Sequence, residues 1–423
     1  MKLTSILSMV LLLSLFSCQK EDATPPIVEV FSPLSASSFD VLDYISVSGL
    51  ASDESALEWV EIKLLNSDLV LVADPIVLYS TENEFSFSAS IHIADIHLNS
   101  GNYFLKVAAS DGENITSNYT EIVLSAVPLA LKNTYLISSA ANSFSLYEVS
   151  GNNSSLTYTF QGQFQSGMVN SYHQYLFFGS DLTGYGYNAD YDFISWEIPL
   201  QLTTYNFFNR AVYSQEDHLN YISHGNGSIK AYDKNGNVLF SSSMNTGEYP
   251  EDILVFNDKV FAEIYSTSFN RDLVVYFKSS GAESHRIAVD KDIVTILPKS
   301  ADELYFFTNN GTSSEFFIYV PTLNTFWSPH TMPQGEINDV VAISDNELII
   351  AHQTGLLRYT YQNNSLVPIV SGIEFNKVKY DALNGVVVAS SANELHYYSN
   401  LGNPIGQVVN SEPIADFYFF YNK

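Results

Sequence analysis

The first third of the chain contains short runs in which apolar and polar side chains alternate. In the segment Val60–Leu64 every second residue is apolar and the residues between are charged, and segments 85–93 and 103–109 repeat the alternation. A period of two with one apolar face predicts β-strands that cover a core on one side. About seven such runs, separated by turn sequences such as Asn66-Ser67-Asp68, predict a β-sandwich over residues 26–126.

The remaining chain, residues 127–423, repeats a tyrosine that ends an apolar run and is followed by a turn. The seven tyrosines are 37 to 45 residues apart, and they are Tyr147, Tyr187, Tyr232, Tyr276, Tyr319, Tyr361 and Tyr398. Repeats of this length that contain only strand signals are typical of a β-propeller. The sequence therefore predicts seven blades.

The strands within these repeats indicate how the ring closes. The first repeat has only three strand-like runs, between residues 135 and 160, whereas the run 414–421 follows the last complete repeat without a partner. A C-terminal strand that completes the first blade removes a free sheet edge, which would otherwise invite aggregation. The predicted fold class is all-β: a β-sandwich followed by a seven-bladed β-propeller that its C-terminal strand closes.

The N-terminal residues have the parts of a secretory signal. Lys2 supplies a positive charge, and the apolar run Leu3–Phe16 is too short to span a bilayer. Leu15-Phe16-Ser17-Cys18 resembles a bacterial lipobox, in which the cysteine is lipidated and becomes the new N-terminus. We expect a signal peptide over residues 1–17 and lipidation of Cys18.

A polar linker over residues 18–25 follows. Because Cys18 is the only cysteine among 423 residues, the chain forms no internal disulfide and folding depends on packed apolar surface. The residues Gln19-Lys20-Glu21-Asp22 resemble the surface-export signal of Bacteroidota-type lipoproteins, and the alternative is a solvated linker. The resemblance implies a lipid anchor in the outer membrane and exposure at the cell surface.

The charge balance restricts the partners. The formal net charge is −28, yet charged residues make up only 15% of the chain, so the acidity comes from a scarcity of Lys and Arg. Without a basic patch, nucleic acid is excluded as a partner. An acidic surface instead attracts cations or basic partners.

Acidic residues recur where the predicted blades begin, one in the connecting loop and one in the first strand. Because the first strand of a blade lines the central channel, these acids are predicted to converge on one mouth and to bind a cation or a polyhydroxylated ligand. The alternative is that each acid caps its own turn by accepting backbone hydrogen bonds. The candidate ligand-binding residues are Glu248, Tyr249, Asp252, Glu336, Asp339, Glu412 and Asp416.

Catalytic motifs are missing from the sequence. It contains no G-x-S-x-G, no H-E-x-x-H, no phosphate-binding loop and no pair of cysteines. We therefore expect no enzymatic activity, no cofactor and no metal site.

The overall plan resembles known surface proteins. PPIVEVFSP and GNYFLKVAASDGENITS resemble bacterial immunoglobulin-like (Ig-like) domains, and the whole chain resembles Bacteroidota lipoproteins that accompany TonB-dependent outer-membrane transporters. The resemblance implies a non-enzymatic protein that binds a small nutrient or glycan and has a transporter as partner. One alternative is an adhesion or scaffold protein that binds another protein through blade loops, and a less favoured one is a propeller hydrolase or lyase.

Overall fold

The computed structural model describes residues 24–203 and 205–423. Cys18 and the predicted signal peptide lie outside the described residues. Every regular element in the described part of the chain is a β-strand, as the predicted all-β class requires. The described residues include no helix with the length and apolar character that crossing a membrane demands. The chain divides into two compact units, Met1–Pro128 and Leu129–Lys423.

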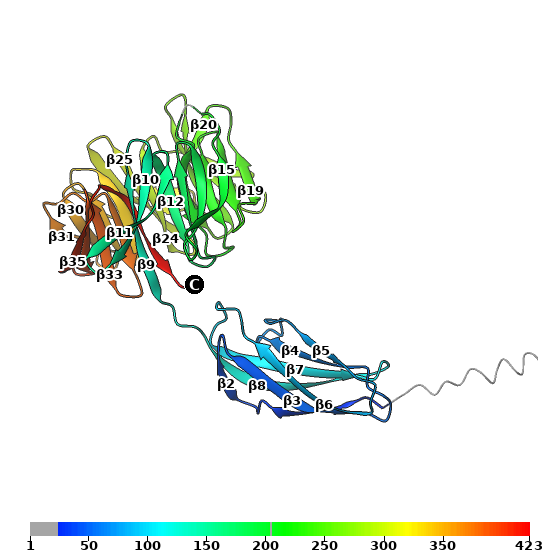
Figure 1. Cartoon of the computed structure of the whole chain (residues 1–423). Helices are drawn as coiled ribbons and strands as arrows, with labels where there is room; N and C mark the ends of the chain where they lie inside the picture. The colour runs from blue at the N-terminus through cyan, green and yellow to red at the C-terminus, as the bar shows by residue number, and fades with distance from the viewer. Residues whose placement is uncertain (1–23, 204) are drawn as a thin grey trace, which may run out of the picture. The chain divides into compact units, whose positions relative to one another are not determined.

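The N-terminal unit consists of two sheets (Figure 1). The order is β1-β3-β6 in the smaller sheet and β2-β8-β7-β4-β5 in the larger, where β2 and β8 are parallel and the other pairs antiparallel. The strands are β1 (Ile27–Ser32), β2 (Ser37–Asp40), β3 (Tyr44–Ser52), β4 (Trp59–Leu65), β5 (Ile76–Tyr79), β6 (Glu84–His92), β7 (Gly101–Ser110) and β8 (Ile115–Ser125).

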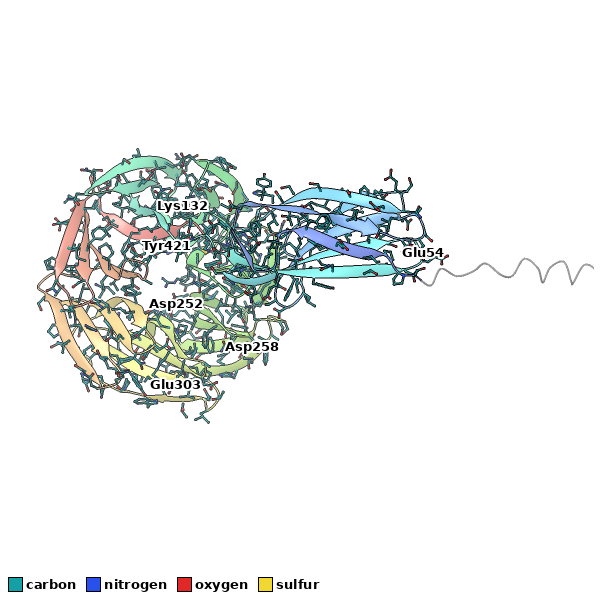
Figure 2. All side chains as sticks on the ribbon, turned by 90° about the horizontal axis from the view of Figure 1, so that it is seen from below. Glu54, Lys132, Asp252, Asp258, Glu303 and Tyr421 are labelled. Atoms are coloured by element: carbon teal, nitrogen blue, oxygen red, sulfur yellow. The ribbon has the colours of Figure 1, made fainter. Side chains whose placement is uncertain are left out.

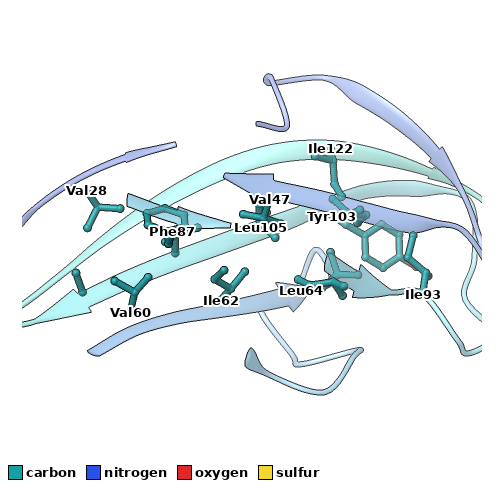
Figure 3. Close-up of a cluster of buried hydrophobic side chains, with 14 of the residues drawn as sticks. Val28, Val47, Val60, Ile62, Leu64, Phe87, Ile93, Tyr103, Leu105 and Ile122 are labelled. Carbon is teal, nitrogen blue, oxygen red and sulfur yellow. The ribbon is translucent and has the colours of Figure 1, made fainter. Parts of the chain in front are cut away.

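The two sheets share one hydrophobic core, which follows from the alternating pattern. Val47 of β3, Ile62 of β4 and Leu105 of β7 are fully buried in a single cluster (Figure 3). Their neighbours in sequence, such as Ser46 and Lys63, lie on the outer faces. Each buried aliphatic side chain stabilises the fold by about 1.5–3 kcal/mol, and this packing stabilises a unit without cysteines.

The C-terminal unit consists of seven four-stranded antiparallel sheets, named I to VII here. Sheet I contains β36 (Ile414–Tyr421), β9 (Leu131–Ser139), β10 (Ser143–Ser150) and β11 (Asn153–Gln161); sheet II contains β12 (Phe164–Asn170), β13 (Tyr175–Ser180), β14 (Thr183–Asn188) and β15 (Phe193–Pro199). Sheet III contains β16 (Phe208–Tyr213), β17 (Asn220–His224), β18 (Ser228–Tyr232) and β19 (Val238–Ser243); sheet IV contains β20 (Glu248–Phe256), β21 (Lys259–Ser266), β22 (Arg271–Phe277) and β23 (Glu283–Ala288). Sheet V contains β24 (Asp292–Ser300), β25 (Glu303–Asn310), β26 (Ser313–Val320) and β27 (Thr325–Trp327); sheet VI contains β28 (Ile337–Ser344), β29 (Glu347–His352), β30 (Gly355–Thr360) and β31 (Ser365–Ser371). Sheet VII contains β32 (Lys377–Asp381), β33 (Val386–Ser391), β34 (Glu394–Ser399) and β35 (Pro404–Val409).

We call the strand named first in each sheet above the first strand of that sheet, so that β36 is the first strand of sheet I. The seven first strands contact one another in cyclic order. β12 contacts β36 and β16, the series continues through β20, β24, β28 and β32, and β32 contacts β36. The unit is thus propeller-like, and Figure 2 shows its ring from below. β36 pairs antiparallel with β9, with Phe417 opposite Leu136 and Tyr418 opposite Tyr135. This pairing agrees with the expectation that the last strand completes the first, incomplete sheet.

The recurring tyrosines lie mostly in the third strand of each sheet. Tyr187, Tyr276 and Tyr319 are buried there, in clusters that combine residues of neighbouring sheets. Sheet VI differs, because Tyr361 follows the end of β30 and is only half-buried, whereas Tyr359 is fully buried within that strand. The tyrosine repeat therefore marks the packing between sheets.

Candidate functional site

Six of the seven first strands, all within the described residues, have a register shift near their start. In β16, Phe208 pairs with His224 and Arg210 with Ser223, so that Asn209 bulges out of the ladder. Such a bulge re-aims the side chains beside it. The corresponding shifts occur in β12, β20, β24, β28 and β36.

The shifts align a four-residue pattern in which an apolar residue or proline is followed by the bulged residue and then by one that we call the channel residue. Phe208-Asn209-Arg210-Ala211 and Ile337-Asn338-Asp339-Val340 are two examples, and Phe375-Asn376-Lys377-Val378 matches them at the start of β32. We define the channel ring as the seven channel residues, which are Ser166, Arg210, Asp252, Thr295, Asp339, Lys377 and Asp416.

Charges from several sheets converge on this ring. Asp252 Oδ1 lies 3.0 Å from Nε of Arg210 on the neighbouring sheet. The charge of Asp252, and to a smaller extent those of Asp339 and Asp416, raises the pKa of Arg210. Aspartates of three different sheets thus act on one guanidinium group, and Figure 2 shows Asp252 on the inner side of the ring. Asp252, Asp339 and Asp416 are thus near enough to affect the same guanidinium group, and ligand binding by these acids stays a prediction.

A second ion pair joins the last sheet to the first. Lys379 Nζ of β32 lies 2.8 Å from Asp416 Oδ1 of β36, and the Tyr418 hydroxyl donates to Asp416 Oδ2 at 2.6 Å. Burial acts to raise the pKa of Asp416, but Lys379 and Lys377 outweigh it and hold that pKa below its ordinary value. Asp416 is therefore an anion at neutral pH, and the pair spans the closure of the ring.

The same aspartates also cap the bulges. Asp339 Oδ1 accepts a hydrogen bond from Val340 N at 3.0 Å, and Asp416 Oδ1 accepts one from Phe417 N at 2.7 Å. Asp339 Oδ2 additionally accepts a hydrogen bond from Val378 N of the next sheet at 3.0 Å. Asp339 and Asp416 therefore satisfy backbone groups, as the alternative reading proposes for each acid.

The bulged residues connect successive sheets. Asn209 Nδ2 donates to Pro250 O at 2.8 Å, and Asn338 Nδ2 donates to Phe375 O at 2.9 Å. Gln165 reverses the direction, since its Oε1 accepts a hydrogen bond from Phe208 N at 2.9 Å. These amides fix the distance between neighbouring first strands, and hence the positions of the channel residues.

The three candidate glutamates behave differently from the aspartates. Glu248 Oε1 lies 2.6 Å from Nη1 of Arg286, and this guanidinium holds the pKa of Glu248 below its ordinary value against the effect of burial. Glu336 and Glu412 lie in the loops before β28 and β36, where their backbone carbonyls accept hydrogen bonds from Gln353 N and from the Asn410 side chain. The ion pairs and hydrogen bonds of the described residues join none of the three glutamates to the channel ring.

Aromatic rings gather on the same side, near the start of β20. The Tyr249 ring lies 4.3 Å from that of Tyr205 between centroids, and Tyr205 and Tyr265 are 6.0 Å apart. Phe269, 6.3 Å from Tyr265, is 80% exposed. Tyr249 is thus part of an accessible aromatic cluster (Tyr205, Tyr249, Tyr265 and Phe269) rather than an isolated residue.

A polar cleft of about 410 Å³ opens beside the starts of the first strands of sheets V to VII. Its lining includes Asn338, the bulged neighbour of Asp339, and Asn376, which precedes Lys377, together with Asn309 and Asp292. We call it the upper cleft, because it lies where the first strands begin. Amide and carboxylate groups there present both hydrogen-bond donors and acceptors to a ligand.

One group of carboxylates has the spacing of a metal site. The carboxylate oxygens of Glu251, Glu263 and Asp292 lie within 4.8 Å of one another. The guanidinium of Arg271 contacts all three, at 2.5 Å from Glu251 and 3.0 Å from Asp292. Arg271 therefore already supplies the cation that these carboxylates need.

Sequence reasoning missed the cations of the site. Arg210 and Lys377 occupy channel positions equivalent to those of the predicted aspartates, and Lys379 lies two residues further along β32. Aligning the four-residue pattern across the repeats would have identified Arg210 and Lys377, because the alignment compares equivalent positions whatever residue occupies them.

The comparisons with known proteins give a structural likeness only. No family model matches the chain, and no curated protein matches it. A chain in a crystal structure of the mitotic checkpoint complex has a TM-score of 0.46 and 11% sequence identity, and the match covers 56% of this chain and 76% of that one.

Proposed function

We propose that this protein is a non-enzymatic surface lipoprotein whose C-terminal unit, a seven-bladed propeller, binds a small nutrient or glycan at the upper mouth of its channel. The observation that carries the proposal is the convergence of Asp252, Asp339 and Asp416 with Arg210 on one ring. Polar side chains from four sheets that act on one another fit a binding site better than a set of independent turn caps.

The balance of charges favours a neutral, polyhydroxylated ligand. Three aspartates of the channel ring are offset by Arg210, Lys377 and Lys379, although the whole chain has a net charge of −28. Sugar hydroxyls donate and accept hydrogen bonds, so they match alternating cations and carboxylates and the asparagines of the upper cleft. The aromatic cluster around Tyr249, in which Phe269 is exposed and the tyrosines are half-buried, offers rings on which a sugar can stack.

The remaining parts of the proposal rest on the sequence. Lipidation of Cys18 anchors the protein in the outer membrane, the N-terminal unit serves as an Ig-like spacer, and a TonB-dependent transporter is the partner that takes up the ligand. A chain with Cys18→Ala is expected to lose labelling by a fatty acid and to leave the membrane fraction. Retention of the label after this substitution would refute the anchor.

A binding screen tests the central claim. The chain from Glu21 onward is expected to bind one member of a panel of glycans and metallophores, and Asp339→Asn is expected to weaken that binding about tenfold, the equivalent of roughly 1.4 kcal/mol. Asp258→Asn is the matched control, because the Asp258 side chain is 76% exposed and lies in the turn after β20. A stable co-purifying protein without any small ligand would favour the scaffold alternative instead.

A further inference from the structure

A second cleft opens at the opposite ends of the first strands. Its volume is about 530 Å³, and its walls come from the segments that end β12, β16, β32 and β36. Most of its lining is aromatic or aliphatic, and the rings belong to Tyr172, Tyr213, His218, Tyr380, Phe419 and Tyr421. We call it the lower cleft, and it shares no lining residue with the upper cleft.

The rings on one wall are held in a defined arrangement. Tyr172 stacks on His218 with 3.6 Å between ring centroids and 9° between ring planes. The Tyr213 hydroxyl lies 2.8 Å from His218 Nδ1, which fixes the orientation of the imidazole. Burial, with smaller contributions from Tyr172 and Asp217, raises the pKa of Tyr213 to about 12, so that its phenol stays neutral. The wall therefore presents ring faces that are already ordered before a ligand arrives.

A buried carboxylate lies behind the other wall. Asp381 is 4% exposed, and its Oδ1 accepts a hydrogen bond from the Tyr421 hydroxyl at 2.9 Å. Asn384 Nδ2 and Leu383 N also donate to this carboxylate, at 2.6 and 3.1 Å. None of the ion pairs formed by the described residues includes Asp381. The Asp381 carboxylate thus has hydrogen-bond donors but no ion-pair partner among the residues that the structure describes.

These features have a common chemical consequence. The face of an aromatic ring attracts a cation, and the attraction grows when the cation sheds water easily. A phenol that donates a hydrogen bond to a carboxylate gains electron density in its ring, which strengthens that attraction. A protein with a net charge of −28 also concentrates cations near its surface.

We propose that the lower cleft binds a weakly hydrated organic cation, such as a quaternary ammonium group, between its tyrosine rings and in front of Asp381. A cation there would balance the buried carboxylate without replacing any of its hydrogen bonds. The inference is independent of the upper-mouth site, because it uses residues at the other ends of the first strands.

The competing ligand class is an anion. Lys423 is the single Lys or Arg residue in the lining of this cleft, and an anionic ligand would use its ammonium group. The substitution Lys423→Met separates the two ligand classes, since it removes repulsion for a cation but removes the binding group for an anion.

Isothermal titration calorimetry on the full chain tests the proposal with choline and with its neutral isostere 3,3-dimethylbutan-1-ol. We expect saturable choline binding and an isostere that binds at least tenfold more weakly. Tyr172→Leu is expected to weaken choline binding about tenfold, whereas Lys423→Met keeps or strengthens it. Tyr191→Leu, at a ring that is 77% exposed and outside the cleft, is the control and leaves the affinity unchanged.

Three results would overturn the inference: no choline binding by the unmodified chain, equal affinity for the neutral isostere, or loss of binding in Lys423→Met. The comparison of choline with its isostere needs no substitution, so it remains decisive even if Tyr172→Leu fails to fold.

Discussion

Lys379 is predicted to hold the ring closed, and Lys379→Met tests this with a side chain of similar length and no charge. Its Nζ lies 2.8 Å from Asp416 Oδ1 and 3.8 Å from the centre of the Tyr418 ring, and it also donates to the Phe417 carbonyl. All three partners belong to β36, whereas Lys379 belongs to β32 of the last sheet. The Lys379 side chain thus binds the strand that completes sheet I through three contacts.

The magnitude follows from the burial of this ion pair. The side chains of Lys379 and Asp416 are 27% and 15% exposed, so the pair is mostly but not wholly removed from water. Breaking a fully buried pair costs about 3–5 kcal/mol, and an exposed pair contributes about 0–1 kcal/mol. We expect Lys379→Met to lower the free energy of unfolding by about 2–3 kcal/mol. For a domain of this size that corresponds to a fall in Tm of roughly 5 °C.

Calorimetry and urea unfolding measure the effect. Lys259→Met is the matched control, because Lys259 also has a carboxylate partner at 3.0 Å and a ring at 3.8 Å, but its partner Asp258 is 76% exposed. The control is expected to lose less than about 1 kcal/mol. Adding Asp416→Asn to Lys379→Met should restore part of the stability, because it removes the carboxylate left without Lys379. Equal losses for Lys379→Met and Lys259→Met would refute the reasoning.

Three further predictions concern stability. Removing residues 414–423 takes away β36 and should lower the melting temperature clearly, and an unchanged melting curve would contradict ring closure by this strand. Burial, with a smaller effect of Lys230, lowers the pKa of His224 to about 3, so between pH 6.5 and 3 only the unfolded chain binds this proton. The free energy of unfolding therefore decreases as the pH is lowered, and at pH 5 urea unfolding should show a loss of about 2 kcal/mol relative to neutral pH. His224→Phe should lack this component. A Cβ at Gly186 would lie 2.2 Å from the Trp196 ring, so Gly186→Ala should cost about 1–3 kcal/mol in the same assay, whereas Gly406→Ala, with open space around it, should be neutral.

The sheets could be predicted because their signals are local. Alternating residues such as those of Val60–Leu64 identify a strand and its buried face without any knowledge of its partners. The strand that closes the ring could be predicted for a different reason: the run 414–421 had no partner nearby, and the first repeat lacked one strand. In both cases the prediction depends on recognising and counting strands along the sequence and does not require side-chain geometry.

The composition of the site could not be predicted in the same way, because it depends on the bulges. A one-residue shift in β20 or β28 decides which acid of a pair faces the ring, so Asp252 and Asp339 reach it whereas Glu336 stays in its loop. A search for acids also passes over Arg210, which holds the same structural position with the opposite charge. Residue type was therefore a poor guide, and position within the shifted register was the informative quantity.

The same register explains why the two mouths of the channel differ chemically. Three residues after Arg210, Lys377 and Asp416 come Tyr213, Tyr380 and Phe419, all of which line the lower cleft. Each of these first strands therefore has a charged residue near its start and a ring near its end. Sheets I, III and VII share this arrangement, and it is the basis for proposing a polar ligand at one mouth and a weakly hydrated one at the other. Tests of the two sites should accordingly respond to different substitutions, Asp339→Asn at the upper mouth and Tyr172→Leu at the lower.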